Sequence, residues 1–346
     1  MTGTETGSPT LAAGETSIRA AVSRDWAGTL RQRARGGGEG GVYLLLAVVL
    51  VTTWLVVVLD GGRFNLENIL VRCVALGIVA CGQTFVIVGG SIDLSVVPMI
   101  TIAAMLTAST STESAASIPI ALGIVVGLAV VVGLANGLIV TVLGVNGFIA
   151  TLGMQLVLQG QLSTHFAENA PERVPAALQN TLGYGELWIV SWSVLMLVVV
   201  VVIAAATMRG TRFGAHIYAA GGDSATARNA GVRVGRTLVG AHVVCSVCAA
   251  LAGFYLAART STPNVELGVN GVYDLQSIAV VVLGGAALLG GRGTVGRTIA
   301  AVLVFALVDV TFNQLGIDPF LQTVARGVII VVAVASYTMR GKEEAA

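Results

Sequence analysis

Long uncharged runs alternate with short polar or glycine-rich breaks along most of the chain. Runs without Asp, Glu, Lys or Arg cover 42–59, 73–92, 94–112, 114–167, 187–208, 237–258 and 275–291. A helix that crosses a hydrocarbon core of about 30 Å needs roughly 20 apolar residues, a length that most of these runs approach or exceed. The runs are apolar on every face, unlike membrane β-strands, whose sides alternate. The pattern therefore predicts an all-α integral membrane protein.

The number of spans depends on the longest run and on two further stretches. The run 114–167 is long enough for two spans, and two glycines and an asparagine at 143–147 favour a turn between them. The stretches 294–312 and 320–339 are also apolar, apart from one or two ionisable residues each. We therefore expect about ten transmembrane helices.

Basic residues gather on one side of this ten-span topology. Five arginines precede the first span, five lie in the loop 209–236, and two each lie near 292–297 and at the C-terminus, which makes 14 of 19 basic residues. The positive-inside rule then places both termini in the cytosol. We expect a mostly disordered cytosolic tail at 1–40, a single polytopic transmembrane domain at 41–340 that includes the loop 209–236, and a cytosolic tail at 341–346.

Composition supports a membrane location. The chain is 55% hydrophobic and 11% charged, against roughly 25% charged in an ordinary soluble domain. The net charge of +1 gives no reason to expect a nucleic-acid partner. Cys73, Cys81, Cys245 and Cys248 lie inside predicted spans, so buried small hydrophobic residues are favoured over a metal or redox site.

A carboxylate interrupts the apolar pattern at Asp93, between paired glycines and a serine. An Asp at the centre of a membrane helix costs about 3 kcal/mol, so this one should face protein or water rather than lipid. A cytosolic turn and a broken helix beside a solute pathway explain the spacing equally well. Gln83, Asp93 and Ser95 are therefore candidate pathway or substrate residues.

A second polar stretch follows the turn near 146. Gln155 and Gln159 are four residues apart, so they share a helix face and could hydrogen-bond a hydroxylated solute. Helix packing explains any single one of them at least as well. Phe148, Thr151, Gln155 and Gln159 complete the list of pathway candidates.

The loop 209–236 is far longer than a connection between two helices requires. Asp223 or Ser224 is a good N-cap, residues 225–230 favour a short helix, and Gly231 is a natural C-cap. We expect this helix to project into the cytosol as a docking surface for another protein.

A glycine cluster at 284–296 predicts a tight cytosolic turn. It is not a phosphate-binding loop, because no Gly-Lys-Ser or Gly-Lys-Thr follows it, and no Walker A motif occurs in the chain. The chain therefore does not hydrolyse ATP in the P-loop manner, and we expect the energy for transport to come from a partner or a gradient.

Four elements together resemble the permeases of bacterial ABC importers for ribose and other monosaccharides, more distantly those for branched-chain amino acids. They are Gly-Gly-x-x-Asp-Leu-Ser at 89–95, Phe-Ile-x-Thr-Leu-Gly at 148–153, the glycine-containing loop 218–232, and the stretch 278–295 that ends in Gly-Gly-Arg-Gly-Thr-Val. The order and topology match over nearly everything after Phe64. Departures include Val97-Pro98 after the first element and Asp223 at a position where Asn is common.

The resemblance implies an inner-membrane, non-catalytic permease subunit that binds no cofactor or metal itself, with ATP and Mg on a partner ATPase. It implies a solute-binding protein on the extracytoplasmic loops 165–186 and 260–272, a second permease subunit and surrounding lipid. The loop helix would be the coupling helix that contacts the ATPase. The coupling residues implied are Gly221, Gly222, Asp223, Ser224, Ala227, Arg228 and Gly231.

Two other functional classes compete with this interpretation. A gradient-driven secondary transporter would need buried ionisable groups, for which Asp93, Asp309 and Arg326 are available. Asp309 and Arg326 fall toward the outer half of the last two spans, where a structural ion pair is favoured over ion coupling. A membrane-embedded enzyme has less support, since no cluster of His, Asp, Glu or Cys is evident at one membrane face.

Overall fold

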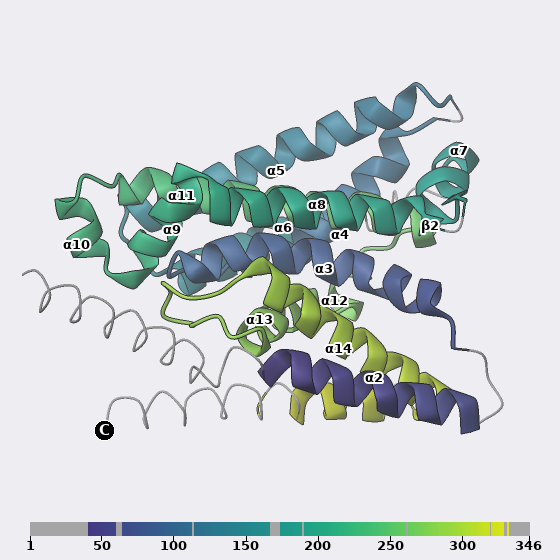
Figure 1. The fold of residues 1–346 in the computed structure, drawn as a ribbon. Coiled ribbons are helices and arrows are strands. Elements are labelled where there is room, and N and C mark those ends of the chain that lie inside the picture. Colours follow the sequence, from purple (N-terminus) through teal and green to yellow (C-terminus); the bar gives the residue numbers. More distant parts are fainter. Residues whose placement is uncertain are drawn as a thin grey trace, which may run out of the picture. The chain divides into compact units, whose positions relative to one another are not determined.

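The described part of the chain is almost entirely helical (Figure 1). The computed structural model describes residues 41–59, 64–112, 114–166, 174–188, 190–260, 262–318, 320–328 and 331, and those from Val42 onward belong to one compact unit. The predicted tails at 1–40 and 341–346 lie outside the described residues. The longer helices are α2 (Gly41–Leu59), α3 (Leu66–Val88), α4 (Val96–Thr110), α5 (Ser117–Val142), α6 (Gly147–Phe166), α8 (Trp192–Gly210), α9 (Arg212–Gly222), α11 (Val234–Thr260), α13 (Tyr273–Leu283) and α14 (Val295–Gln314).

Short elements complete the described structure. A three-residue helix, α7 (Ala176–Leu178), runs into a π-helical turn, η1 (Gln179–Gly183), and the antiparallel pair β1 (Glu186–Leu187) and β2 (Val190–Ser191) follows. The helix α10 (Ser224–Asn229) lies between α9 and α11, and α12 (Leu267–Asn270) precedes α13.

Six described helices are long and apolar enough to cross a membrane, namely α2, α3, α5, α8, α11 and α14. The helix α4 and the segment Leu267–Leu283 are apolar but shorter. Residues 320–328 are helical, and most of the remainder of the predicted span 320–339 lies outside the described residues. The structure thus supports an all-α membrane protein, while the count of ten spans stays a prediction.

Two predicted span boundaries are wrong. The helix α3 begins at Leu66 rather than Cys73, because the Asn65 side chain accepts a hydrogen bond from the Asn68 N–H and caps it. The run 275–291 does not form one helix. Its helical part ends at Leu283, and Gly284 and Gly285 turn the chain into a loop. Eleven residues of α13 extend only about 16 Å at 1.5 Å per residue, too short to cross the membrane alone.

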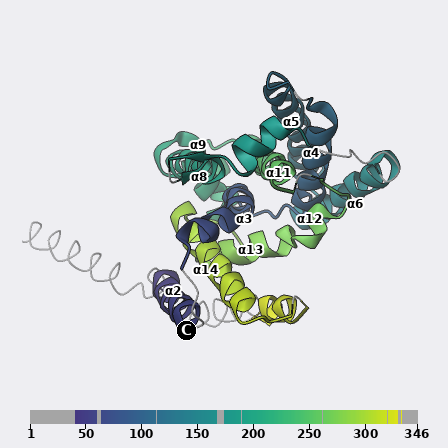
Figure 2. The same cartoon turned by 90° about the vertical axis from the view of Figure 1, so that its right-hand side faces the viewer.

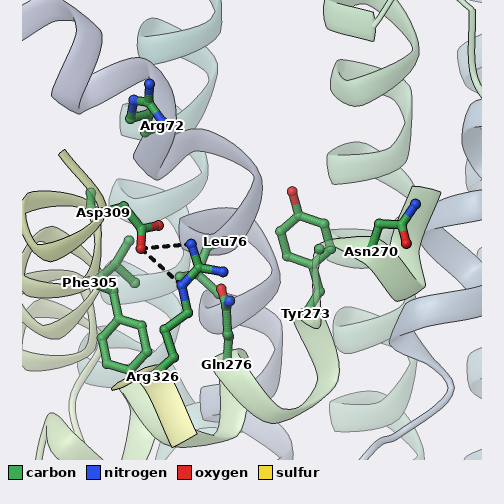
Figure 3. A pocket seen from close by; sticks show the side chains of 11 residues that line it. Arg72, Leu76, Asn270, Tyr273, Gln276, Phe305, Asp309 and Arg326 are labelled. Carbon is green, nitrogen blue, oxygen red and sulfur yellow. Dashed lines mark hydrogen bonds and ion pairs between the residues drawn. The ribbon is translucent and has the colours of Figure 1, made fainter. Parts of the chain in front are cut away.

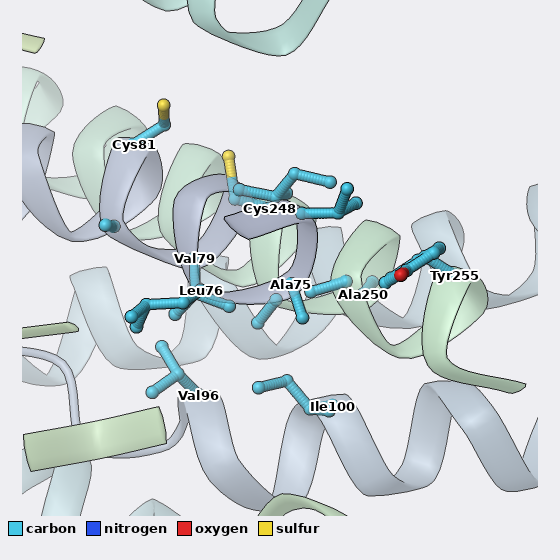
Figure 4. Packing of buried hydrophobic residues seen from close by; sticks show 14 of the residues in the cluster. Ala75, Leu76, Val79, Cys81, Val96, Ile100, Cys248, Ala250 and Tyr255 are labelled. Atoms are coloured by element: carbon cyan, nitrogen blue, oxygen red, sulfur yellow. The ribbon is translucent and has the colours of Figure 1, made fainter. Parts of the chain in front are cut away.

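The core is built around α3, which is buried from Cys73 to Val88 (Figure 2). In Figure 4, Leu76 and Val79 of α3 lie opposite Val96 and Ile100 of α4. All four cysteines are free and buried, as predicted. By contrast, α2, α5 and α8 carry many exposed large hydrophobic side chains, which suits contact with lipid.

Helix α11 packs closely on α5 because glycines line the contact. A Cβ at Gly133 would lie 2.5 Å from the Cα of Val243, and one at Gly137 would lie 2.5 Å from the Cα of Val239. No side chain fits at either position, so the two backbones approach as small residues allow in membrane helices. This contact brings polar residues of α5 and α11 against the break between α3 and α4.

Candidate functional site

The chain between α3 and α4 leaves helical conformation and stays inside the protein. The helix α3 ends at Val88, Gly90 adopts a φ of 85°, and α4 starts at Val96. Asp93 is fully buried, and its Oδ1 accepts hydrogen bonds from the N–H and the hydroxyl of Ser95 at 2.9 and 2.6 Å. The predicted carboxylate therefore faces protein rather than lipid.

His242 of α11 lies between this carboxylate and a serine. Its Nδ1 is 3.3 Å from Asp93 Oδ2, and its Nε2 is 3.1 Å from Ser91 Oγ. A carboxylate accepts hydrogen bonds, so Nδ1 is the ring nitrogen placed to donate to Asp93, and Nε2 faces the Ser91 hydroxyl. Hydrolases use the same residue types. Here His242 and Asp93 are completely buried in the arrangement that the structure shows, unlike the open active site of a hydrolase.

Helices α3, α5 and α6 add further hydrogen bonds to this cluster. Asn136 of α5 donates from Nδ2 to Ser95 Oγ at 2.8 Å, and Gln83 of α3 donates from Nε2 to the Asp93 carbonyl at 3.2 Å. Thr151 Oγ1 of α6 accepts from the Leu94 N–H at 3.1 Å. We call Gln83, Ser91, Asp93, Ser95, Asn136, Thr151 and His242 the polar network. It fixes the broken segment to four helices.

The structure separates the predicted pathway residues into two groups. Gln83, Asp93, Ser95 and Thr151 come together in the polar network. Phe148, Gln155 and Gln159 lie on α6 with Thr151 but outside the network, where Phe148 is 47% exposed, Gln155 is half-buried and Gln159 is exposed. Within the described residues, the side chains of Gln155 and Gln159 have no hydrogen-bond partner, so both amides are free to meet a solute or another chain.

The loop 209–236 contains the predicted short helix, preceded by a second one. The helix α10 has Asp223 as its N-cap, with Oδ1 accepting from the Thr226 N–H at 2.6 Å. This backbone hydrogen bond is the main cause that lowers the pKa of the Asp223 carboxyl, so the cap is ionised at neutral pH. Gly231 follows the helix with a φ of 85°, as expected for a C-terminal glycine. The sequence did not predict α9.

We expect Asp223→Ala to weaken α10, because loss of a side-chain N-cap costs about 1 kcal/mol. Asp223→Asn is the matched control, since an amide oxygen caps the same Thr226 N–H. Hydrogen exchange of residues 224–229 in the full-length protein should be faster in the Ala variant and near wild type in the Asn variant. Equal exchange in all three proteins would contradict the capping role.

The coupling residues implied by the resemblance differ in exposure. Gly222, Asp223, Ser224, Arg228 and Gly231 are exposed and available to a partner.

The remaining two coupling residues face the protein. Ala227 is buried with Ala220 and Val234, which anchors α10 to α9 and α11. Gly221 lies against Val88, where a Cβ would collide with the Val88 carbonyl oxygen. The helix α10 therefore has one face fixed to the protein and one free.

Three glycine pairs from distant parts of the sequence meet beside this helix, and we call them the glycine junction. They are Gly89-Gly90, Gly221-Gly222 and Gly290-Gly291. The Gly291 N–H donates to the Val88 carbonyl at 2.8 Å, and a Cβ at Gly290 would lie 2.7 Å from the Gly221 oxygen. Nearby, the Tyr218 hydroxyl donates to the Gly293 carbonyl at 2.7 Å. Backbone contacts thus join the α9–α10 segment to the end of α3.

Residues 65–334 match the family described as the permease component of the branched-chain amino acid transport system. The chain belongs to this family. The permease is 36% identical to the probable ABC transporter permease protein YphD of Escherichia coli over 84% of its own length and 87% of that protein. It is 33% identical to the E. coli ribose import permease protein RbsC, in an alignment that covers 78% of this chain and 84% of RbsC. No solved structure matches it.

A third relative extends the comparison. The E. coli L-arabinose transport system permease protein AraH is 30% identical over 85% of the permease and 88% of its own length. The permease is thus a transmembrane subunit of an ABC importer in the bacterial inner membrane, and it is a transport subunit rather than an enzyme. The importer interpretation is confirmed, and the gradient-driven alternative is not supported.

Sequence reasoning left Ser91 of the permease's polar network off the list of candidates, and it also missed His242 and Asn136. Both lie in runs that count as uncharged when histidine is taken as neutral. An ionisable or amide side chain within a membrane helix is itself a signal of an inward-facing functional or structural position. His242 could have been found on that ground, but its pairing with Asp93 could not, because 149 residues separate the two.

Proposed function

We propose that this permease moves a monosaccharide or a similar small polar solute across the inner membrane by alternating access, driven by a cytosolic ABC ATPase. The named substrates of two relatives, ribose and L-arabinose, support the solute class. The observation that carries the mechanism is the capped, half-exposed helix α10, joined through the glycine junction to the buried break after α3.

The permease's own residues suggest how ATPase movement reaches the pathway. A shift of α10 moves Gly221 through the buried contact of Ala227 with Ala220 on α9. Gly221 contacts Val88, and the hydrogen bond of Gly291 to Val88 links the same point to the loop before α14. Val88 immediately precedes the segment that holds Asp93. Movement at the ATPase would therefore reposition the broken segment, and with it α5, α6 and α11.

The remaining parts of the proposal concern topology and partners. About ten spans with both termini in the cytosol put α10 on the ATPase side and residues 165–186 and 260–272 outside, facing a solute-binding protein. The amides of the half-buried Gln155 and the exposed Gln159, with Phe148, would line the pathway where a second permease subunit closes it. Lipid covers the apolar faces of α2, α5 and α8. The permease binds no cofactor, metal or nucleic acid, and ATP with Mg binds to the ATPase.

Co-purification tests the ATPase partner. In wild type, the tagged full-length permease should recover a P-loop ATPase from membranes of its native host. Ala227→Pro should abolish this recovery, because Ala227 donates its N–H to the Asp223 carbonyl at 2.9 Å and proline removes that bond. Asp223→Asn, which keeps the cap, is the control. Equal recovery with Ala227→Pro would contradict docking on α10.

Uptake tests the solute class. Liposomes that contain the permease, its ATPase and its binding protein should accumulate at least one of labelled D-ribose, L-arabinose and D-galactose when ATP is enclosed. Uptake should continue when an uncoupler removes ion gradients and ATP is maintained. No uptake of any of these sugars would contradict the proposed solute class, and loss of uptake with the uncoupler would contradict ATP-driven transport.

A further inference from the structure

A cavity of about 240 Å³ lies between α3, α12, α13, α14 and the helical residues 320–328 (Figure 3). Its volume corresponds to about eight waters at about 30 Å³ each, enough for a single sugar ring. Apolar side chains form part of the wall, including Leu76 and Phe305. The polar side chains that line it are Arg72, Asn270, Tyr273, Gln276, Asp309 and Arg326.

An ion pair stands at one side of this cavity. Arg326 Nη2 lies 2.8 Å from Asp309 Oδ1, and Arg326 Nε donates a hydrogen bond to the same oxygen at 3.0 Å. This confirms the pairing predicted from the sequence. Both side chains are about one-quarter exposed, at 23% and 26%. Among the residues that the structure describes, the second carboxylate oxygen of Asp309 and the remaining N–H groups of Arg326 have no partner and are available to a ligand.

The other polar groups around the cavity are not paired with each other or with the ion pair. Within the described residues, the side chains of Arg72, Asn270, Tyr273 and Gln276 make no hydrogen bond or ion pair. Gln276 is only 7% exposed, yet its amide is not among the buried polar groups that lack a partner, so the amide keeps its accessible surface toward the cavity that it lines. A ligand in the cavity can therefore form hydrogen bonds to it.

The lining selects for hydroxyl groups. Guanidinium groups only donate hydrogen bonds and an ionised carboxylate only accepts them, whereas amides and the Tyr273 hydroxyl do both. A polyhydroxylated ring can satisfy all of these groups because each hydroxyl both donates and accepts. The two guanidinium groups outnumber the one carboxylate, so an anion is the competing ligand, and the phosphate measurement below separates it from a sugar. Phe305 offers an apolar surface to the C–H face of a ring.

The cavity lies far from the ATPase end of the permease. Arg72 precedes Val88 of the glycine junction by 16 residues of continuous helix, which is about 24 Å at 1.5 Å per residue. Asp309 is likewise near the far end of α14. With α10 in the cytosol, this is the extracytoplasmic half, where a solute enters.

We propose that this cavity is a binding site for a monosaccharide entering from the outer side, with Tyr273 and Gln276 as ligand-binding residues. The inference rests on the proposed function and adds a site within one subunit to it. Tyr273 and Gln276 come from α13, and Asp309 comes from α14. The loop between these helices includes Gly290 and Gly291 of the glycine junction, so the site and the coupling segment share one structural connection.

The test uses the complete importer in liposomes with labelled D-ribose, L-arabinose and D-galactose. Tyr273→Phe and Gln276→Leu each remove hydrogen-bonding groups while keeping the approximate size of the side chain. Each should lower the sugar transported per ATP hydrolysed about fivefold, as expected for loss of one hydrogen bond worth about 1 kcal/mol. ATP hydrolysis stimulated by the loaded binding protein should persist, which loss of folding would not allow.

Matched controls are Tyr43→Phe on the exposed face of α2 and Gln161→Leu on α6, neither of which lines the cavity. Both should transport like wild type. If the wild type takes up sugar and both cavity variants transport as much sugar per ATP as the wild type, the proposed cavity site is wrong and the proposed function still stands. Failure of the wild type to take up any sugar would overturn the proposed solute as well. The proposed sugar site would also be overturned, in favour of an anion site, if inorganic phosphate but no sugar stabilised the permease and Arg72→Gln removed that stabilisation.

Discussion

Gly221→Ala should reduce ATP-driven uptake at least tenfold. A Cβ at this position would collide with the Val88 carbonyl oxygen and lie 2.7 Å from the Gly291 nitrogen. The glycine junction would have to separate, which would break the hydrogen bond from Gly291 to Val88. Overpacking costs about 1–3 kcal/mol, and about 1.4 kcal/mol already changes the ratio of two conformations tenfold. Uptake into liposomes by the assembled importer measures the effect.

Gly222→Ala is the matched control for folding at the next position. A Cβ there has no heavy atom within 4 Å, so the permease should keep its wild-type melting temperature whatever the methyl group does to ATPase docking. Gly221→Ala should lower the melting temperature, yet still insert and be recovered with the ATPase. Wild-type uptake by Gly221→Ala would show that the glycine junction does not transmit movement.

Asp93→Ala should destabilise the permease by about 3–5 kcal/mol, the range for removing one partner of a buried polar pair. Three donors lose their acceptor inside the protein: the N–H and hydroxyl of Ser95, and the Nδ1–H of His242. A buried donor without a partner costs about 1–3 kcal/mol, and partial relaxation makes the sum smaller than three full penalties. Because folded proteins have only about 5–15 kcal/mol of stability, we expect a large loss of folded protein in membranes.

Asp93→Asn separates the need for hydrogen bonds from the need for charge. Its Oδ1 can still accept both bonds from Ser95, and its Nδ2 can donate to His242 Nδ1 if the ring proton moves to Nε2 and Ser91 accepts it. The Asn variant should therefore lose much less stability than the Ala variant. Thermal unfolding in detergent and the yield of folded protein compare the two. Equal losses would mean that the negative charge itself is required.

The sequence was most informative where structure depends on neighbouring residues. The helix α10, its cap at Asp223 and the glycine at 231 are encoded within ten residues, and the structure has all three. Hydrophobic runs located most of the long helices because one run supplies a complete lipid-compatible surface. The same rule misplaced the start of α3, because a charge at Arg72 was taken as the end of a span.

Resemblance added what local rules could not, namely the permease family and the role of an importer subunit, and the comparisons confirmed both. It did not locate a solute site. All seven pathway candidates stay predictions, namely Gln83, Asp93, Ser95 and Thr151 in the polar network and Phe148, Gln155 and Gln159 elsewhere on α6.

By itself, the sequence determined that this protein is an all-α membrane permease with a capped helix available to a partner. Only the tertiary structure showed that His242 and Asn136 reach the segment around Asp93, that three glycine pairs meet, and that α13 and α14 enclose a polar cavity with α3. The physical reason is the range of the interactions. Caps and apolar runs act within a few turns of one helix, whereas these contacts join residues far apart in sequence and depend on how the helices pack.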